Sequence, residues 1–153
     1  VSLINVDAVA FGAYMRVSYS SRFTEKPQFI CLQENDKFTV ETSSGGNGAL
    51  TYPVGLITTD EIVAAGGTYG DYDESYYLYK KKAYWSFTPI RMNTTSLHIF
   101  SVGLNGELSS FLATSAPSIS PVINIKKEYV NQISGTGIMS DPFKLTIPED
   151  DSN

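Results

Sequence analysis

The chain has 153 residues, of which 42% are hydrophobic and 18% charged, a composition typical of one folded globular domain. Its single Cys excludes an intrachain disulfide, and one Cys with one His cannot complete a structural zinc site. A net charge of −5 argues against a protein that tracks nucleic-acid phosphates, so we expect no nucleic-acid partner. We also expect no catalytic residue, cofactor or metal ligand, since ten Tyr and eight Phe favour a binding surface over a catalyst.

We expect residues 1–153 to form a single domain, because the sequence shows no internal repeat and no low-complexity linker. The first residue is Val1 and not Met, which indicates that any leader or anchor lies outside this chain. No apolar stretch approaches the roughly 18 residues of a membrane helix, so we expect no membrane segment. The acidic tail, residues 148–153, is expected to fray.

Short apolar or aromatic runs separated by Gly, Asn, Ser or Pro predict strands along most of the chain. Residues 6–17 fit either a helix or a strand, and their periodicity does not decide between the two. The predicted strands then follow in chain order at residues 29–32, 38–41, 76–79, 84–87, 97–102, 107–112, 122–125 and 143–146. Short strands, little helix and much irregular chain predict an α+β domain.

One short helix is predicted over residues 59–65. Thr58 and Glu61 have the capping-box spacing, in which each side chain satisfies an amide at the helix start. Ile57 and Ile62 flank them as a hydrophobic staple, and Gly66 offers a left-handed stop.

A hairpin is predicted between the strands at residues 97–102 and 107–112. Asn105 and Gly106 stand between them, and Asn-Gly supplies the two left-handed residues of a type I′ turn.

Three acids in one loop, Asp71, Asp73 and Glu74, have a spacing that resembles part of a calcium loop. The residues that follow do not supply the remaining oxygen ligands or a terminal bidentate acid. We therefore favour a solvated loop without a metal ion.

For two other reactive residue types, Cys and Lys, we favour a structural role over a catalytic or ligand-binding one. Cys31 stands in an apolar run with no basic neighbour, which favours a small buried hydrophobic residue over a nucleophile. The basic run of Lys80, Lys81 and Lys82 is interpreted as a solvated turn, in preference to a patch for an anionic ligand.

The phase of the strand at residues 97–102 decides which side chains are displayed. Strand alternation separates Leu97, Ile99 and Ser101 from His98 and Phe100. If the first set faces the core, His98 and Phe100 point outward together. The only Trp, at position 85, is expected to be buried.

Several motifs between about residues 27 and 145 resemble a domain common in surface and pilin-like proteins of gut Firmicutes. They include the run Gly46–Glu61 with Leu50-Thr51-Tyr52-Pro53-Val54-Gly55-Leu56, then Tyr84-Trp85-Ser86 and Pro121-Val122-Ile123-Asn124-Ile125. The resemblance implies a C-type lectin fold of the formylglycine-generating-enzyme type. Such a fold has small twisted antiparallel sheets, one or two short helices and much irregular loop, and it is similar to variable proteins diversified by retroelements.

The resemblance also implies a ligand face between the Trp segment and the Pro-Val-Ile-Asn strand, which here means residues 87–120. The residues expected on that face are Phe87, Ile90, Arg91, Asn93, Ser96, His98, Phe100, Asn105, Glu107, Ser109 and Phe111.

Two activities of related proteins are not carried over. The calcium tripeptides of carbohydrate-binding lectins do not occur in the sequence, and the sulfatase-modifying enzymes need reactive cysteines in the C-terminal region.

The sequence thus predicts a non-enzymatic, surface-displayed binding domain, a variable receptor or adhesin module. Its expected partner is a protein or glycan on another cell, a phage or a host surface. The alternatives are a structural pilin-like or appendage subunit that mediates assembly and, ranked third, a hydrolytic enzyme whose carboxylates the sequence does not identify.

Overall fold

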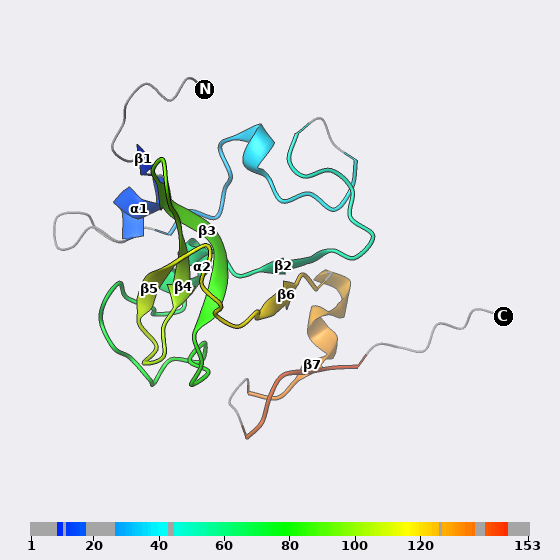
Figure 1. Cartoon of the computed structure of the whole chain (residues 1–153). Helices are drawn as coiled ribbons and strands as arrows, with labels where there is room; N and C mark the ends of the chain where they lie inside the picture. Colours follow the sequence, from blue (N-terminus) through cyan, green and yellow to red (C-terminus); the bar gives the residue numbers. More distant parts are fainter. Residues whose placement is uncertain are drawn as a thin grey trace. The chain divides into compact units, whose positions relative to one another are not determined.

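The structure, a computed structural model, describes residues 9–10, 12–17, 27–42, 45–125, 127–136 and 140–146. Residues 148–153, predicted to fray, lie outside them. The chain is a small mixed α/β protein with a few short helices and small antiparallel sheets (Figure 1). It divides into two compact units, Val1–Val122 and Ile123–Asn153. The single-domain prediction stays a prediction.

The main sheet of the first unit has four strands in the order β1-β3-β4-β5, each antiparallel to its neighbour. They are β1 (Val9–Ala10), β3 (Tyr84–Met92), β4 (Leu97–Val102) and β5 (Leu108–Leu112). The strand predicted at 97–102 is confirmed, and the one predicted at 84–87 continues to Met92. Register shifts along β3 on both sides of Pro89 accommodate this longer strand.

Two short helices, α1 (Gly12–Val17) and α2 (Thr59–Ala64), belong to the same unit. The predicted capping box is confirmed, because Glu61 donates its amide to the Thr58 hydroxyl and the Glu61 carboxylate accepts the Thr58 amide. Gly66 follows with a φ of +106°, the left-handed stop that the sequence predicts. The ambiguous stretch 6–17 contains both a strand, β1, and a helix, α1.

The hairpin between β4 and β5 is confirmed, but its predicted turn type is wrong. The Gly103 amide bonds the Glu107 carbonyl at 2.8 Å, and of the loop residues Leu104, Asn105 and Gly106 only Gly106 is left-handed. This is a three-residue loop that ends in a left-handed glycine. The Asp73 amide donates to the Asn105 carbonyl at 3.1 Å, so the preceding loop holds the turn in a conformation that local propensity alone does not predict.

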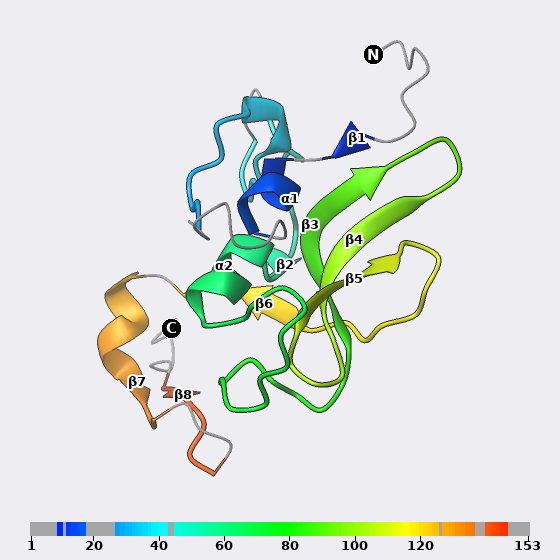
Figure 2. The same ribbon diagram turned by 90° about the vertical axis from the view of Figure 1, so that its left-hand side faces the viewer.

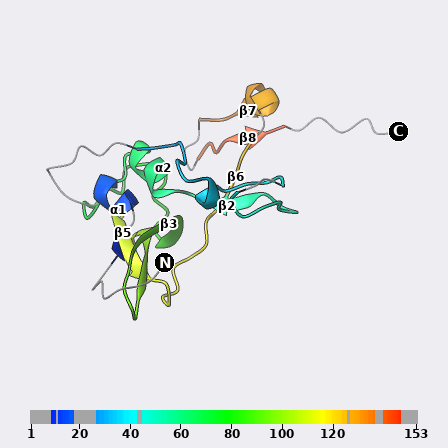
Figure 3. The ribbon, with the colours of Figure 1, turned by 90° about the horizontal axis from the view of Figure 1, so that it is seen from above.

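The core of the first unit lies between the helices and one face of the sheet. Both helices lie on the same side of β3 and β4, which Figure 2 shows from the side and Figure 3 from above. Inside the core, the Ser86 hydroxyl donates to the Phe100 carbonyl at 2.8 Å. The buried hydrophobic residues are Ala13, Val17, Ile62, Tyr84, Ile90, Phe100, Val102 and Leu108.

Three predicted strands of the first unit are wrong. Residues 29–32 and 38–41 flank a short 3-10 helix, η1 (Glu34–Asp36), and residues 76–79 form a turn. Their apolar side chains find no sheet to pair with in the described chain, and Phe29, Ile30 and Leu32 stay largely exposed. Apolar runs of four residues are too short to fix a strand without a partner. A separate two-stranded sheet joins β2 (Val54–Leu56) with β6 (Pro121–Ile123).

The second unit contains a 3-10 helix, η2 (Lys127–Gln132), followed by β7 (Ile133–Ser134) and β8 (Lys144–Leu145). The two strands are antiparallel, with Ile133 opposite Leu145. The predicted strand at 143–146 is therefore partly confirmed.

Candidate binding face

The two faces of the main sheet carry different side chains. Tyr84, Val102 and Leu108 lie opposite one another on β3, β4 and β5, and all three are buried in the core. Because successive side chains alternate between faces, the next row lies on the opposite face, which we call the open face. That row contains Trp85, Ser101 and Ser109.

A second row of the open face lies further along the strands and contains Pro89, Ile99 and Phe111. These three side chains are half-buried, as is Trp85. The rings of Trp85 and Phe111 meet edge to face, with centroids 6.2 Å apart. This geometry is favourable for two aromatic rings, which hold each other in a defined orientation.

Ser101 lies between these rings on the middle strand, opposite Trp85 on β3 and Ser109 on β5. Its side chain is fully buried, and its hydroxyl has no hydrogen-bond partner. A buried hydroxyl without a partner costs stability. The centre of the open face therefore contains a buried polar group that no hydrogen bond satisfies.

The structure corrects two of the predicted ligand-face residues. Phe100 is completely buried and Ile90 is 2% exposed, so both belong to the core and not to a displayed surface. The prediction took Ile99 and Ser101 as the core face of β4. The helices pack against the other face, where Val17 and Ile62 contact the cluster that contains Phe100.

Two more predicted residues, Ser109 and Phe111, lie on the open face by their register. The Trp that shares this face was predicted to be buried, and that prediction is wrong. Its partner Ile99 was assigned to the core for the same reason, the inverted phase of β4.

Phe87 is half exposed, but it lies near a different group of residues. Its amide donates to the Ile57 carbonyl at 2.8 Å, and its ring meets Phe38 edge to face at 5.6 Å. Phe87 therefore belongs to β3, and its ring contacts Phe38 in the irregular segment before β2.

Four predicted residues gather at the turn between β3 and β4. Arg91 pairs with His98 across the two strands. The Asn93 side-chain oxygen accepts from the amides of Thr95 and Ser96 at 2.9 and 2.7 Å, which shapes the turn. Arg91 and Asn93 are exposed, whereas His98 and Ser96 are half-buried.

The last two predicted residues, Asn105 and Glu107, belong to the turn between β4 and β5. The Glu107 carboxylate accepts the Asn105 amide at 3.0 Å, so both stabilise the hairpin. Nearby, Tyr76 has a partly buried ring and a hydroxyl without a partner. Burial, and then the charges of Asp73 and Glu107, raise the pKa of Tyr76 to about 12.

The acidic loop is held by hydrogen bonds between its own residues. Asp73 accepts the amide and the hydroxyl of Ser75 at 2.7 and 2.5 Å, and these bonds lower the pKa of the Asp73 carboxyl. The described residues contain no group of three His, Cys, Asp or Glu side chains arranged to hold a metal ion. Cys31, expected in the core, is exposed, because the strand predicted around it does not form.

Comparison of the chain with protein-family models, with curated proteins and with solved structures found no match. The resemblance to C-type-lectin-fold domains therefore stays a prediction. Within the described residues, none of the helices has the length and apolar character that crossing a membrane requires.

The structure brings together Ser109 and Phe111 with Trp85, Ile99 and Ser101 on the open face. It does not bring the eleven predicted residues into one surface. The sequence alone does not fix the phase, which follows once Tyr84 is placed in the core. Counting in steps of two from Tyr84, which the core contains, assigns Ser86 and Ile90 to the core face and Trp85 to the other.

Proposed function

We propose that this chain is a non-enzymatic binding domain that recognises a protein or a glycan through the open face of its main sheet. The single observation that carries the proposal is the aromatic pair of Trp85 and Phe111, which is only partly buried and lies on a face that the helices do not cover. Aromatic side chains of this kind give large contact areas with little loss of conformational freedom.

The surroundings of the aromatic pair support a rigid site. Three antiparallel strands fix the backbone beneath it, and the core holds these strands from the other side through Tyr84, Phe100 and Leu108. A face fixed in this way does not have to be ordered when a ligand binds, which favours affinity. The half-buried Ser109 has a hydroxyl group on the same face.

The finer parts of the proposal rest on the sequence. Its motifs support a C-type lectin fold and display on a cell surface or appendage. They also support variation by a retroelement within residues 87–120. A near-copy of the DNA that encodes this segment, differing at adenines beside a reverse transcriptase, is expected if the domain is diversified. An adjacent region without such a copy contradicts that part.

Trp85 provides the test of binding, because it is the only Trp in the chain and lies on the proposed face. A glycan array and a displayed peptide library are screened with the whole chain, and the hits are titrated by Trp fluorescence. We expect hits that change the Trp85 emission. The Phe111→Ala variant is expected to bind these hits at least about tenfold more weakly, since aromatic anchors dominate such interfaces.

Tyr72→Ala is the matched control, since Tyr72 is a 74% exposed aromatic residue in a loop outside the sheet. It is expected to bind the hits as the native chain does. Hits that bind the Phe111→Ala and native chains equally, or a screen without hits, would overturn the proposal. Circular dichroism of each variant shows whether weaker binding comes from the missing side chain or from an unfolded chain.

A further inference from the structure

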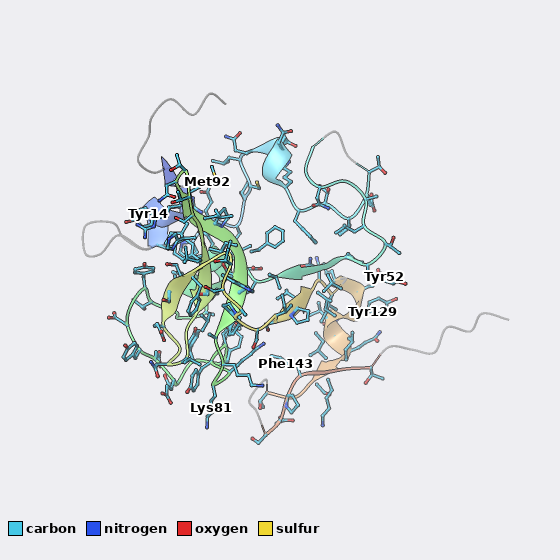
Figure 4. The ribbon with its side chains drawn as sticks, in the orientation of Figure 1. Tyr14, Tyr52, Lys81, Met92, Tyr129 and Phe143 are labelled. Carbon is cyan, nitrogen blue, oxygen red and sulfur yellow. The ribbon has the colours of Figure 1, made fainter. Side chains whose placement is uncertain are left out.

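A second candidate site lies at the end of the main sheet where β3 begins, and Tyr84, the residue before Trp85, lines it. A surface cavity of about 460 Å³ lies there between two segments of the first unit. Lys80, Lys82 and Tyr84 line it from one segment, and Ser118 and Ser120 line it from the other. Figure 4 shows the neighbouring Lys81 at this end of the sheet, opposite the end that contains Met92.

The two walls of the cavity are fixed to each other by the backbone. The Ser118 amide donates to the Ala83 carbonyl at 2.9 Å, and the Trp85 amide donates to the Ser118 carbonyl at 3.1 Å. The hydroxyl-bearing segment therefore keeps a constant distance from the lysines. This pairing uses backbone groups only, and the Ser118 and Ser120 side chains line the cavity.

Lys80 is held in place inside this cavity. Its ammonium group lies 5.2 Å from the centre of the Tyr84 ring and donates to the Ser120 hydroxyl. The Tyr84 ring is buried, and its own hydroxyl donates to the Leu78 carbonyl at 2.8 Å. The positive charge of Lys80 is thus positioned by a rigid neighbour instead of sampling the solvent freely.

The backbone at this place adopts an unfavourable conformation. Lys81 has a φ of +54° and is the only residue other than glycine with a positive φ among those that the structure describes. A left-handed backbone is unfavourable for a lysine, and such residues gather at functional sites. Lys81 itself does not line the cavity.

The charge of the cavity is not compensated within the part of the chain that the structure describes. The whole chain has an excess of acids, with a net charge of −5. Yet the described ion pairs are Arg16–Asp60 and Lys37–Glu34, and neither involves Lys80 or Lys82. Two ammonium groups beside two hydroxyls, without a carboxylate, form a set of donors for an anion.

We propose that this cavity binds a sulfate or phosphate monoester on a sugar-sized ligand. Lysines are point charges that suit a compact tetrahedral anion, and two lysines with two hydroxyls match its several oxygens. The cavity is larger than an inorganic anion. Ile119 and Pro121 complete its lining and give the apolar part of the ligand a surface to contact. This site does not depend on the aromatic face.

The test is a titration of the whole chain with glucose 6-sulfate, glucose 6-phosphate and glucose, followed by NMR or calorimetry. We expect one or both esters to bind at millimolar strength, more weakly as salt is added, and glucose not to bind. The ester that binds more tightly shows whether the site prefers a sulfate or a phosphate. Lys80→Gln and Lys82→Gln are each expected to weaken binding at least about fivefold.

Lys81→Gln is the matched control, since it removes the same charge from the same run but outside the cavity. It is expected to change the affinity less than about twofold, and Phe111→Ala is expected to leave it unchanged. Esters that bind no better than glucose would overturn the proposal. Equal weakening by all three lysine variants would also overturn it, because the effect would then be a general one of net charge.

Discussion

The two faces of the main sheet are formed by the same three strands, yet their side chains are buried to different extents. On the core face, Tyr84, Phe100 and Leu108 are almost completely buried beneath the helices. On the open face, Trp85 and Phe111 are only partly buried and contact each other across the middle strand. Residue type alone does not assign a face, since aromatic side chains occur on both.

The helices decide which face becomes the core. Val17 of α1 and Ile62 of α2 pack into the core cluster, and both are almost fully buried. The Arg16 guanidinium contacts the Asp60 carboxylate at 2.8 Å, which joins the two helices. A face without such a layer keeps its apolar side chains available for a partner.

The largest difference between the faces is expected from truncating one Phe on each. Phe100→Ala should lower the free energy of unfolding by about 3–5 kcal/mol, because it leaves a cavity in the core. Phe111→Ala should lower it by about 1 kcal/mol, since its ring is only partly buried. Urea unfolding of both variants measures this. Equal losses would contradict the assignment of the two faces.

The ion pair between the helices gives the next largest effect. Asp60 is 6% exposed and accepts bonds from the Arg16 side chain and the Gln28 amide, so Asp60→Ala should cost about 2–3 kcal/mol. Glu34→Ala removes an exposed pair with Lys37 and should cost less than about 1 kcal/mol. Thermal unfolding compares the two, and an equal loss would show that the helix layer is not held in this way.

Two serines on neighbouring strands sharpen the comparison further. The Ser86 hydroxyl lies on the core face and donates to the Phe100 carbonyl, so Ser86→Ala should cost about 1 kcal/mol. The Ser101 hydroxyl lies under the aromatic pair without a partner, so Ser101→Ala should be neutral or stabilising. Calorimetric melting temperatures decide this prediction, and it fails if Ser101→Ala is the more damaging change.

The smallest effect is expected at alkaline pH. Burial raises the pKa of Tyr76 from 10 to about 12, so the neutral side chain is favoured in the folded state. Its contribution to stability is complete below pH 10 and is lost as the pH rises towards 12. The melting temperature of the native chain should therefore fall below that of Tyr76→Phe over this range. If the melting temperatures of the two chains change with pH in parallel, burial does not raise the pKa of Tyr76.

The sequence was sufficient where a local pattern determines the structure. The capping box of Thr58 and Glu61 and the left-handed Gly66 lie at the two ends of one short helix, and both are confirmed. The hairpin at Gly106 is confirmed for the same reason. Its turn type depends on the contact with Asp73, which is distant along the chain, and was predicted wrongly.

The candidate site was only partly predictable, because its residues depend on the phase of β4. The predicted phase was inverted, so Phe100 was assigned to the surface and Ile99 to the core. The helices, which pack through Val17 and Ile62, determine which face is buried. Alternation cannot tell which of two apolar faces a helix will cover. The strands predicted at 29–32 and 38–41 failed in a related way, since they have no partner in the described chain.

Acrylamide quenching of the native chain tests the open face most directly, because Trp85 is its only Trp. A partly buried Trp85 beside Phe111 should be partly quenched in the folded state, and Phe111→Ala should increase the quenching towards that of a free indole. A Trp85 that acrylamide reaches only after unfolding, in both chains, would contradict an open aromatic face.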